Sequence, residues 1–263
     1  MSHVSRPGAD IFFEASDLDG PVLLLAHGFF MDSTMFERQA TAAVAAGLRL
    51  VTWDARAHGQ TRSKGPFDYW DSARDALAVL DELGAEQAFV GGMSQGGYCA
   101  LRTALLAPER VRALVLLDTE ASACTAGEAA GYREFFGAWA NDNVPLEPLA
   151  RGLAPQLIGG TEADQEPWIA KWLTTGRQHW NDAAEALTTR DSVTSRLGEI
   201  SCPALVIRGE SDETATAEKA AALAAGLPGA GTVRTIAGAG HAANWTDPES
   251  VNQELLSFLV QNL

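Results

Sequence analysis

The sequence predicts an α/β fold: a mainly parallel sheet of about eight strands, with helices on both faces and an inserted group of helices. Three observations lead to this prediction. The length of 263 residues suits one large domain. Short aliphatic runs alternate with helix-like segments along most of the chain. These runs are apolar almost throughout, which is typical of parallel strands covered on both faces.

Six aliphatic runs are predicted to be strands, and they lie at residues 22–26, 48–53, 88–91, 113–117, 204–208 and 233–236. An earlier segment, residues 11–14, is predicted to form an antiparallel edge hairpin with residues 22–26. Helices are expected between the strands, at residues 71–83, 96–106 and 215–225. A final helix is expected to begin at Asp247 and Pro248, because these residue types favour the N-cap and the first turn.

The alternation of strand and helix stops between residues 119 and 200. That stretch has no strand-like run, but it has four amphipathic segments, at residues 127–141, 146–157, 163–175 and 180–189. We therefore predict a core α/β domain built from residues 1–118 and 201–263, with a helical cap at residues 119–200 inserted between its two parts.

The composition excludes some classes of partner. Lys and Arg total 19 and Asp and Glu total 34, so the formal net charge is −15. Such a chain repels nucleic-acid phosphates and anionic lipids, and we expect neither a nucleic-acid nor a membrane partner. The three cysteines form no CxxC, and the first eight residues lack the apolar core of a secretory signal. We expect a cytoplasmic protein that acts on a small-molecule substrate.

The strongest local motif is Gly92-Met93-Ser94-Gln95-Gly96, which matches G-x-S-x-G. It lies between a predicted strand and a predicted helix, so Ser94 is expected at a sharp strand-to-helix turn that exposes its hydroxyl. Such a turn forces a sparsely populated backbone conformation, and Gly92 and Gly96 remove side chains that would collide there. The motif predicts that Ser94 is a nucleophile.

A serine nucleophile needs a base, and the base needs an acid. In strand–turn–helix serine sites the chain order is serine, acid, histidine. Of the five histidines, only His241 follows the last predicted strand. Asp212 lies just after the strand at residues 204–208, where active-site groups of parallel sheets gather. Glu210 and Asp118 remain alternative acids.

An oxyanion formed at the serine would need backbone N–H donors. We assign the N–H of Gln95, at the start of the helix, and the N–H of Phe29, in the loop after residues 22–26. Gly28 lets that loop turn closely. His27 is expected to hold the loop through a hydrogen bond, without a catalytic role.

Together these residues resemble the α/β-hydrolase superfamily over essentially the whole chain. The motifs that carry the resemblance are His27-Gly28, Asp54-Ala55-Arg56-Ala57-His58-Gly59, Gly92-Met93-Ser94-Gln95-Gly96, Asp212 and His241, in that order. Within the superfamily the chain is similar to small esterases, enol-lactonases and cofactor-free perhydrolases. It departs from the usual pattern at Ala57, Thr61 and Gln95. Arg56 and His58 are interpreted as architectural.

The resemblance implies acyl transfer without a metal or cofactor. In this reading Ser94 attacks the carbonyl of an ester or lactone of a small-to-medium, mainly apolar substrate, with His241 as general base, and water then hydrolyses the acyl-enzyme. Perhydrolysis or carbon–carbon bond cleavage by the same residues, and a non-enzymatic ligand receptor, remain alternatives. A dehalogenase or an epoxide hydrolase is disfavoured, because those relatives have Asp in place of Ser94.

The pocket is expected to be apolar and aromatic. The candidates for substrate contact are Phe30, Met93, Trp139, Trp168, Trp172 and Trp245. Packing between the cap and the core is the alternative role for each tryptophan.

Overall fold

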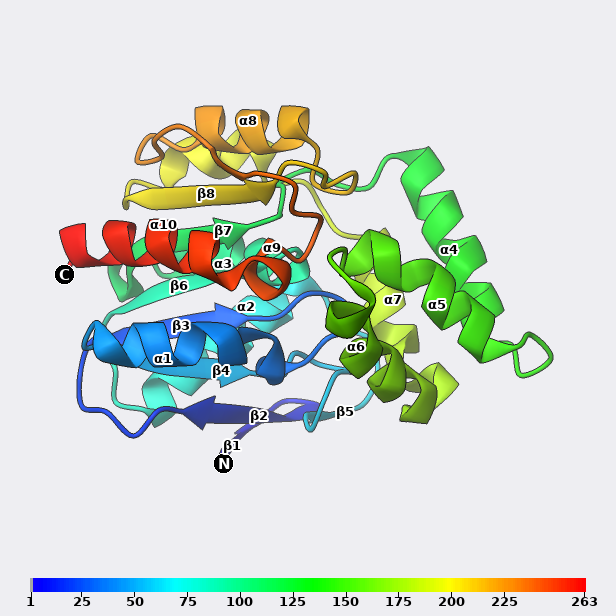
Figure 1. Ribbon diagram of the computed structural model, residues 1–263. Coiled ribbons are helices and arrows are strands. Elements are labelled where there is room, and N and C mark those ends of the chain that lie inside the picture. Colours follow the sequence, from blue (N-terminus) through cyan, green and yellow to red (C-terminus); the bar gives the residue numbers. More distant parts are fainter. Residues whose placement is uncertain (1) are drawn as a thin grey trace.

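A nine-stranded sheet forms the centre of the structure, a computed structural model that describes residues 2–263 (Figure 1). Its strands are β1 (Ser2–Arg6), β2 (Ala9–Ala15), β3 (Val22–Ala26), β4 (Arg49–Trp53), β5 (Arg62–Ser63), β6 (Ala88–Met93), β7 (Val111–Leu117), β8 (Ala204–Gly209) and β9 (Arg234–Ile236). The strand order is β1-β2-β4-β3-β6-β7-β8-β9, and β5 pairs with β2. From β4 to β9 all neighbours are parallel. The predicted fold class is confirmed.

Helices cover both faces of this sheet. They are α1 (Glu37–Ala45), α2 (Tyr69–Glu82), α3 (Gln95–Leu106), α8 (Ala217–Gly226), α9 (Ala243–Thr246) and α10 (Pro248–Gln261). Figure 1 shows α1 and α10 in front of the sheet and α2 and α3 behind it. In β3, Leu23 and Leu25 join the apolar cluster of one face, and Leu24 joins that of the other. Burial on both faces explains why this strand is uninterruptedly apolar.

The predicted hairpin between residues 11–14 and 22–26 is wrong. Strand β2 pairs antiparallel with β1 and with β4. Strand β3 already has β4 and β6 as its two neighbours, so it has no open edge for a third. Strand β1 alternates exposed and half-buried residues at the edge of the sheet, and its polar sequence gave no apolar run to detect.

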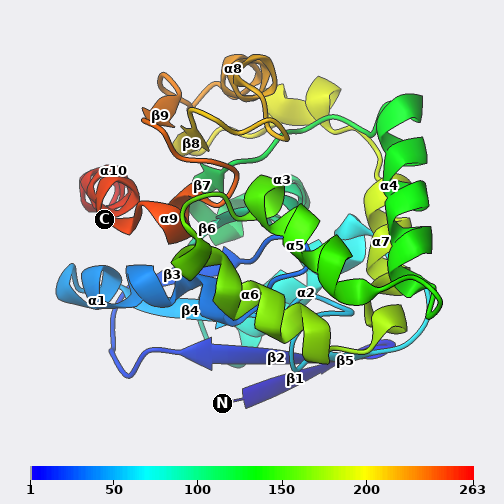
Figure 2. The ribbon, with the colours of Figure 1, turned by 45° about the vertical axis from the view of Figure 1, so that its right-hand side comes forward.

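Four helices lie over the carboxyl ends of the parallel strands (Figures 1 and 2). They are α4 (Ala126–Ala140), α5 (Leu146–Leu157), α6 (Glu162–Thr174) and α7 (Asn181–Thr188). Each agrees with a predicted segment to within one residue at either end. Short 3₁₀ helices also occur, η1 (Ser33–Phe36), η2 (Pro108–Arg110), η3 (Arg177–Trp180) and η4 (Thr194–Glu199). In the part of the chain that the structure describes, no helix has the length and apolar character needed to cross a bilayer.

The loop after β4 is anchored to α2 by a buried ion pair. Arg56 donates from Nε to Asp75 Oδ2 at 2.7 Å and from Nη2 to Asp75 Oδ1 at 2.9 Å. Asp75 is fully buried, and its hydrogen bonds raise the pKa of Arg56. These contacts give Arg56 the architectural position that the sequence predicts for it.

Arg56→Ala is expected to lower the free energy of unfolding by about 3 kcal/mol, because it leaves the Asp75 carboxylate buried with only the longer contact to Arg6. Urea denaturation measures this. Arg74→Ala is the matched control, since the Arg74–Asp71 pair is largely exposed and should contribute less than about 1 kcal/mol. Equal losses in the two variants would contradict the anchoring role of Arg56.

Candidate active site

Ser94 occupies the turn between β6 and α3. Its backbone has φ 52° and ψ −114°, a region that L-residues avoid. A Cβ added at Gly92 or at Gly96 would collide with the carbonyl oxygen of Ala26. Only glycine therefore lets α3 start so close to β3. The predicted tight turn is confirmed, and Ser94 is held in a strained conformation at the carboxyl end of a central strand.

His241 and Asp212 come together from the loops after β9 and β8. The distance from His241 Nδ1 to Asp212 Oδ2 is 2.8 Å. The other carboxylate oxygen, Asp212 Oδ1, accepts from the backbone N–H of Thr214 at 2.8 Å and of Ala215 at 3.1 Å. Burial alone would raise the pKa of Asp212, but the hydrogen bonds outweigh it, and this pKa lies below its usual value. An ionised Asp212 accepts the proton of His241 Nδ1, which leaves Nε2 unprotonated in the neutral ring.

Ser94 and His241 line the same cavity. The Nε2 atom of His241 is buried, and it has no hydrogen-bond partner within residues 2–263. The two side chains are thus brought to one space without a hydrogen bond between them. In proteins without substrate, such contacts are often long and tighten only when substrate binds.

Neither alternative acid contacts His241. Glu210 is exposed, and its Oε2 accepts from the backbone N–H of Gly238 at 2.9 Å. Asp118, at the end of β7, is buried, and its Oδ1 accepts from the N–H of Gly209 at 2.7 Å. Burial and the neighbouring Asp212 carboxylate raise the pKa of Asp118 well above its usual value. Of the three acids weighed from the sequence, Asp212 is the one that contacts His241.

Of the two predicted oxyanion donors, Phe29 lines the same cavity, and Gln95 directly follows Ser94 as the first residue of α3. No backbone hydrogen bond within residues 2–263 uses the N–H of Phe29 or of Gln95. The loop that carries Phe29 is fixed by His27, which accepts from the N–H of Ala55 at 2.9 Å and donates from Nδ1 to the carbonyl of Gly28 at 2.8 Å. The predicted hydrogen bond of His27 within its loop is confirmed, and the contact with Ala55 adds a link to the loop after β4.

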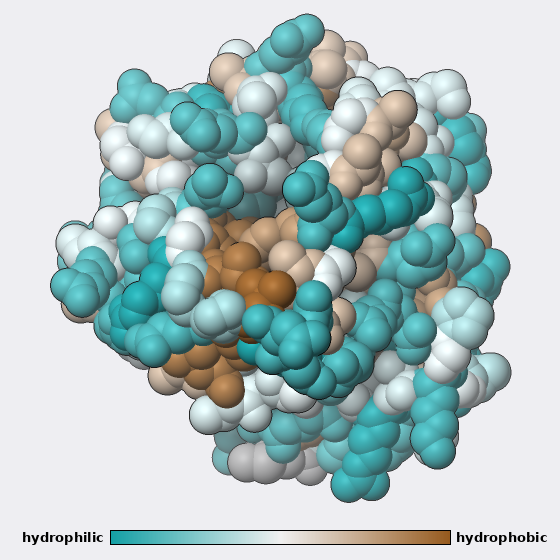
Figure 3. All heavy atoms as spheres, turned by 90° about the vertical axis from the view of Figure 1, so that its right-hand side faces the viewer, coloured by the Kyte–Doolittle hydropathy of each residue, from teal (hydrophilic) through white to brown (hydrophobic). Residues whose placement is uncertain are grey.

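The cavity is small, and aromatic and aliphatic side chains form most of its lining. Its volume is about 110 Å³, and its lining residues are Phe29, Phe30, Ser94, Tyr98, Tyr132, Phe135, Phe136, Leu153, Gln156, Leu157, Leu187, Thr214 and His241. Helices α4 and α5 form much of its wall, and an apolar patch reaches the surface on the face that carries them (Figure 3). No lining residue is Lys or Arg. Phe30, one of the six predicted substrate contacts, is among them.

The other five predicted contacts, Met93, Trp139, Trp168, Trp172 and Trp245, are buried but do not line this cavity. Trp172 donates from Nε1 to the carbonyl of Phe30 at 2.7 Å, and the ring of Trp139 lies 4.6 Å from the ring of Phe30. Trp168 packs edge-on against Trp245 at 5.3 Å. These side chains pack the helical layer onto the core, so the cavity gives their predicted role in substrate contact no support.

Sequence reasoning missed nine lining residues, and two patterns could have found some of them. Tyr98 follows Ser94 by four residues on α3, so the two share one face of the helix. Tyr132, Phe135 and Phe136 stand at positions i, i+3 and i+4 of α4, which is an aromatic face. The remaining ones, on α5, on α7 and in the loop after β8, depend on how those segments pack.

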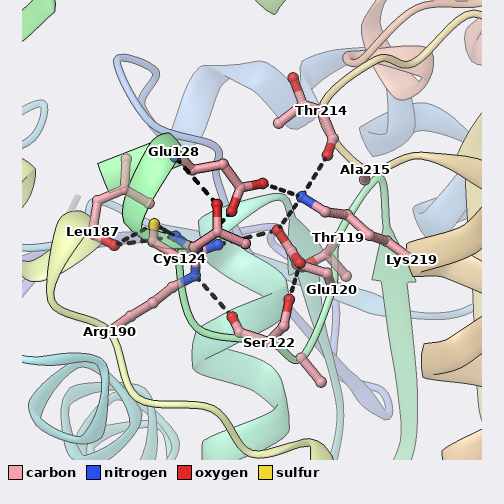
Figure 4. A network of polar contacts seen from close by, with 12 residues as sticks. Thr119, Glu120, Ser122, Cys124, Glu128, Leu187, Arg190, Thr214, Ala215 and Lys219 are labelled. Carbon is pink, nitrogen blue, oxygen red and sulfur yellow. Dashed lines mark hydrogen bonds and ion pairs between the residues drawn. The ribbon is translucent and has the colours of Figure 1, made fainter. Parts of the chain in front are cut away.

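A polar network lies behind this wall (Figure 4). The buried Arg190 donates to Glu120 Oε1 at 3.0 Å. Lys219, on α8, donates to Glu120 Oε1 at 3.0 Å, to Glu128 Oε1 at 2.8 Å and to the carbonyl of Thr214 at 3.2 Å. Burial alone would raise the pKa of Glu128, but the hydrogen bonds from Lys219 and Thr125 lower it to about 2. The network thus ties the first turn of α4 to the loop that carries Asp212.

Comparison with known proteins places these features among hydrolases. A sequence model described as "Alpha/beta hydrolase family" matches residues 23–254. The chain is 29% identical over 272 residues to the putative carbamate hydrolase RutD of Azorhizobium caulinodans, with 98% of each chain covered. It is 30% identical over 241 residues to a 2-hydroxy-6-oxononadienedioate/2-hydroxy-6-oxononatrienedioate hydrolase of Paraburkholderia phymatum, covering 86% of this chain and 81% of that protein. Among solved structures, a thermophilic esterase from Thermogutta terrifontis superposes with a TM-score of 0.87 at 26% identity, covering 99% of this chain and 97% of the other.

Proposed function

The chain belongs to the alpha/beta hydrolase family, and from this premise we propose that it is a serine hydrolase that cleaves small carboxylic esters or lactones through an acyl-enzyme. One observation carries the proposal: the strained Ser94 shares a cavity with a histidine whose Nε2 is free and whose Nδ1 is held by Asp212. These are the groups that convert a serine hydroxyl into a nucleophile.

The proposed reaction has two halves. Ser94 Oγ attacks the carbonyl carbon while His241 Nε2 takes its proton, and Asp212 stabilises the resulting imidazolium. The N–H groups of Phe29 and Gln95 donate to the oxyanion. Collapse of the intermediate expels the alkoxide, which takes the proton from His241 and leaves the acyl group on Ser94. His241 then activates water, and the acid is released.

Substrate size follows from the cavity. An apolar cavity of about 150 Å³ holds benzene, so 110 Å³ suits an acyl group of a few carbons. With p-nitrophenyl esters, kcat/KM is expected to be highest for acyl chains of two to four carbons and to fall at least about tenfold by octanoate. A rate that rises steadily through octanoate would contradict this assignment of the acyl site.

An active-site label tests the nucleophile directly. A serine-directed fluorophosphonate is expected to phosphonylate Ser94 Oγ with loss of fluoride, so that the peptide containing Ser94 gains the mass of the reagent less HF, because the reagent requires an activated hydroxyl. The Ser94→Ala variant should stay unlabelled. Labelling at another serine, or none in the wild-type protein, would overturn the proposed function.

Carbon–carbon bond cleavage is the second candidate, because one relative carries the name of a dienedioate hydrolase. The dioate in that name has two carboxylates, whereas no Lys or Arg lines the cavity here. A pocket that binds such a dianion is expected to present cations to it. The lining therefore favours an ester or lactone over a dioate as the substrate.

A further inference from the structure

Tyr98 lies on α3, one helical turn beyond Ser94, and lines the cavity. The residue is 5% exposed, and within residues 2–263 no hydrogen bond involves its hydroxyl. The hydroxyl oxygen is not among the fully buried polar atoms that lack a partner, which agrees with its place at the wall of the cavity. The position of Tyr98 therefore leaves a hydrogen-bond donor available to whatever occupies the cavity.

The ring of Tyr98 is held from two sides. The guanidinium of Arg190 lies over the ring, 4.8 Å from its centroid. The ring of Tyr69 meets it edge-on at 5.3 Å, and the Tyr69 hydroxyl is itself engaged with Gln95 Oε1 at 3.2 Å. Because the ring is already fixed, the Tyr98 side chain loses little conformational entropy when its hydroxyl binds a ligand.

Arg190 is not placed to bind a substrate carboxylate in place of Tyr98, because each of its three guanidinium nitrogens already donates to the protein. Its Nε donates to the carbonyl of Ser122 at 3.1 Å, its Nη1 to the carbonyl of Leu187 at 3.1 Å and its Nη2 to Glu120 at 3.0 Å (Figure 4). Lys219 is likewise held by Glu120 and Glu128. The two cations and two carboxylates balance, so this wall presents no net charge to the cavity.

From this geometry we propose that the Tyr98 hydroxyl donates a hydrogen bond to an oxygen within the acyl group of an uncharged substrate. The substrate class is then neutral esters or lactones whose acyl part carries a carbonyl, hydroxyl or ether oxygen besides the scissile carbonyl. This inference rests on the proposed function and narrows it. Burial also raises the pKa of Tyr98 well above its usual value, so the hydroxyl keeps its proton at any pH at which the protein is assayed.

The test compares methyl 3-oxobutanoate with methyl butanoate, which has the same acyl chain length but lacks the ketone oxygen at C3. Tyr98→Phe is expected to lower kcat/KM on the oxo ester about three- to tenfold more than it lowers kcat/KM on methyl butanoate. For each ester, kcat/KM of the wild type is divided by kcat/KM of the variant, so that the different intrinsic reactivities of the two esters cancel. Equal ratios for the two esters would overturn the inference. Tyr132→Phe is the control at the other tyrosine of the cavity, and a loss of kcat/KM in this variant that is confined to the oxo ester would also overturn it.

A binding measurement separates failure of this inference from failure of the proposed function. In the Ser94→Ala variant, methyl 3-oxobutanoate should bind at least about threefold more tightly than methyl butanoate by NMR titration, and adding Tyr98→Phe should remove the difference. Monomethyl succinate should bind no better than methyl butanoate. Tighter binding of this anion, or equal binding of the two neutral esters, would overturn the inference while leaving hydrolysis by Ser94 intact. Absence of phosphonate labelling at Ser94 in the wild-type protein would instead overturn the proposed function.

Discussion

Replacing Ser94 with alanine is expected to lower kcat/KM for p-nitrophenyl butanoate by roughly 10³- to 10⁶-fold while the protein stays folded. The variant keeps the cavity and the His241–Asp212 pair but has no oxygen to attack the ester. Initial rates at substrate concentrations well below KM measure the effect. Ser257→Ala is the matched control, because Ser257 is exposed on α10. Activity in Ser94→Ala within about tenfold of wild type would remove Ser94 from the mechanism.

The same position tests the strain in the turn. Ser94→Gly is expected to be equally inactive but to unfold with a free energy about 1 kcal/mol higher than Ser94→Ala, because glycine adopts a φ of 52° without a steric penalty. Urea denaturation of the two variants side by side gives the difference. Equal stabilities would mean that the backbone of residue 94 stores no strain.

Asp212→Asn is expected to lower kcat/KM about 10⁴-fold, because an amide facing His241 Nδ1 stabilises the wrong tautomer and cannot compensate the charge of the imidazolium. The same substitution at the other two acids provides the comparison. Asp118→Asn should stay within about tenfold of wild type, since Asp118 Oδ1 bonds the backbone N–H of Gly209 and does not contact His241, and burial raises the pKa of Asp118, which disfavours its charged form. Glu210→Gln should change the rate less than about twofold, because Glu210 is exposed.

The pattern across these three variants decides which acid acts. A loss in Asp118→Asn as large as that in Asp212→Asn would show that Asp118 takes part in the charge balance of His241. A loss in Asp118→Asn far larger than that in Asp212→Asn would mean that Asp118, and not Asp212, is the acid that supports His241. Thermal melts of each variant separate loss of activity from loss of fold.

The arrangement around Ser94 could be predicted because the signals are local. Gly92 and Gly96 are required because a Cβ at either position would collide with Ala26 on the neighbouring strand. Glycines between a strand-like run and a helix-like segment can be recognised in the sequence alone, because glycine marks turns. The four helices of residues 126–188 were likewise recognisable from their periodicity.

The lining of the cavity could not be predicted in the same way. A large apolar residue such as Trp172 suits a substrate pocket and a packing interface equally well by composition. The difference depends on the angle at which α6 meets the core, where Trp172 donates to the carbonyl of Phe30. Pairing of β2 with β4 also escaped prediction, because residues far apart in the chain determine which edge of the sheet is open.

The cavity draws its residues from two separate parts of the chain. Ser94 and His241 come from loops of the sheet, as does Asp212, which contacts His241 from outside the cavity lining. The opposite wall, Tyr132, Phe135, Phe136, Leu153, Gln156, Leu157 and Leu187, comes from α4, α5 and α7. Substitutions on the inner faces of these three helices can reshape the space without moving the proposed reacting groups. An evolving lineage, or a protein engineer, can therefore exchange one substrate for another within residues 126–188 while the bond-breaking chemistry is inherited unchanged.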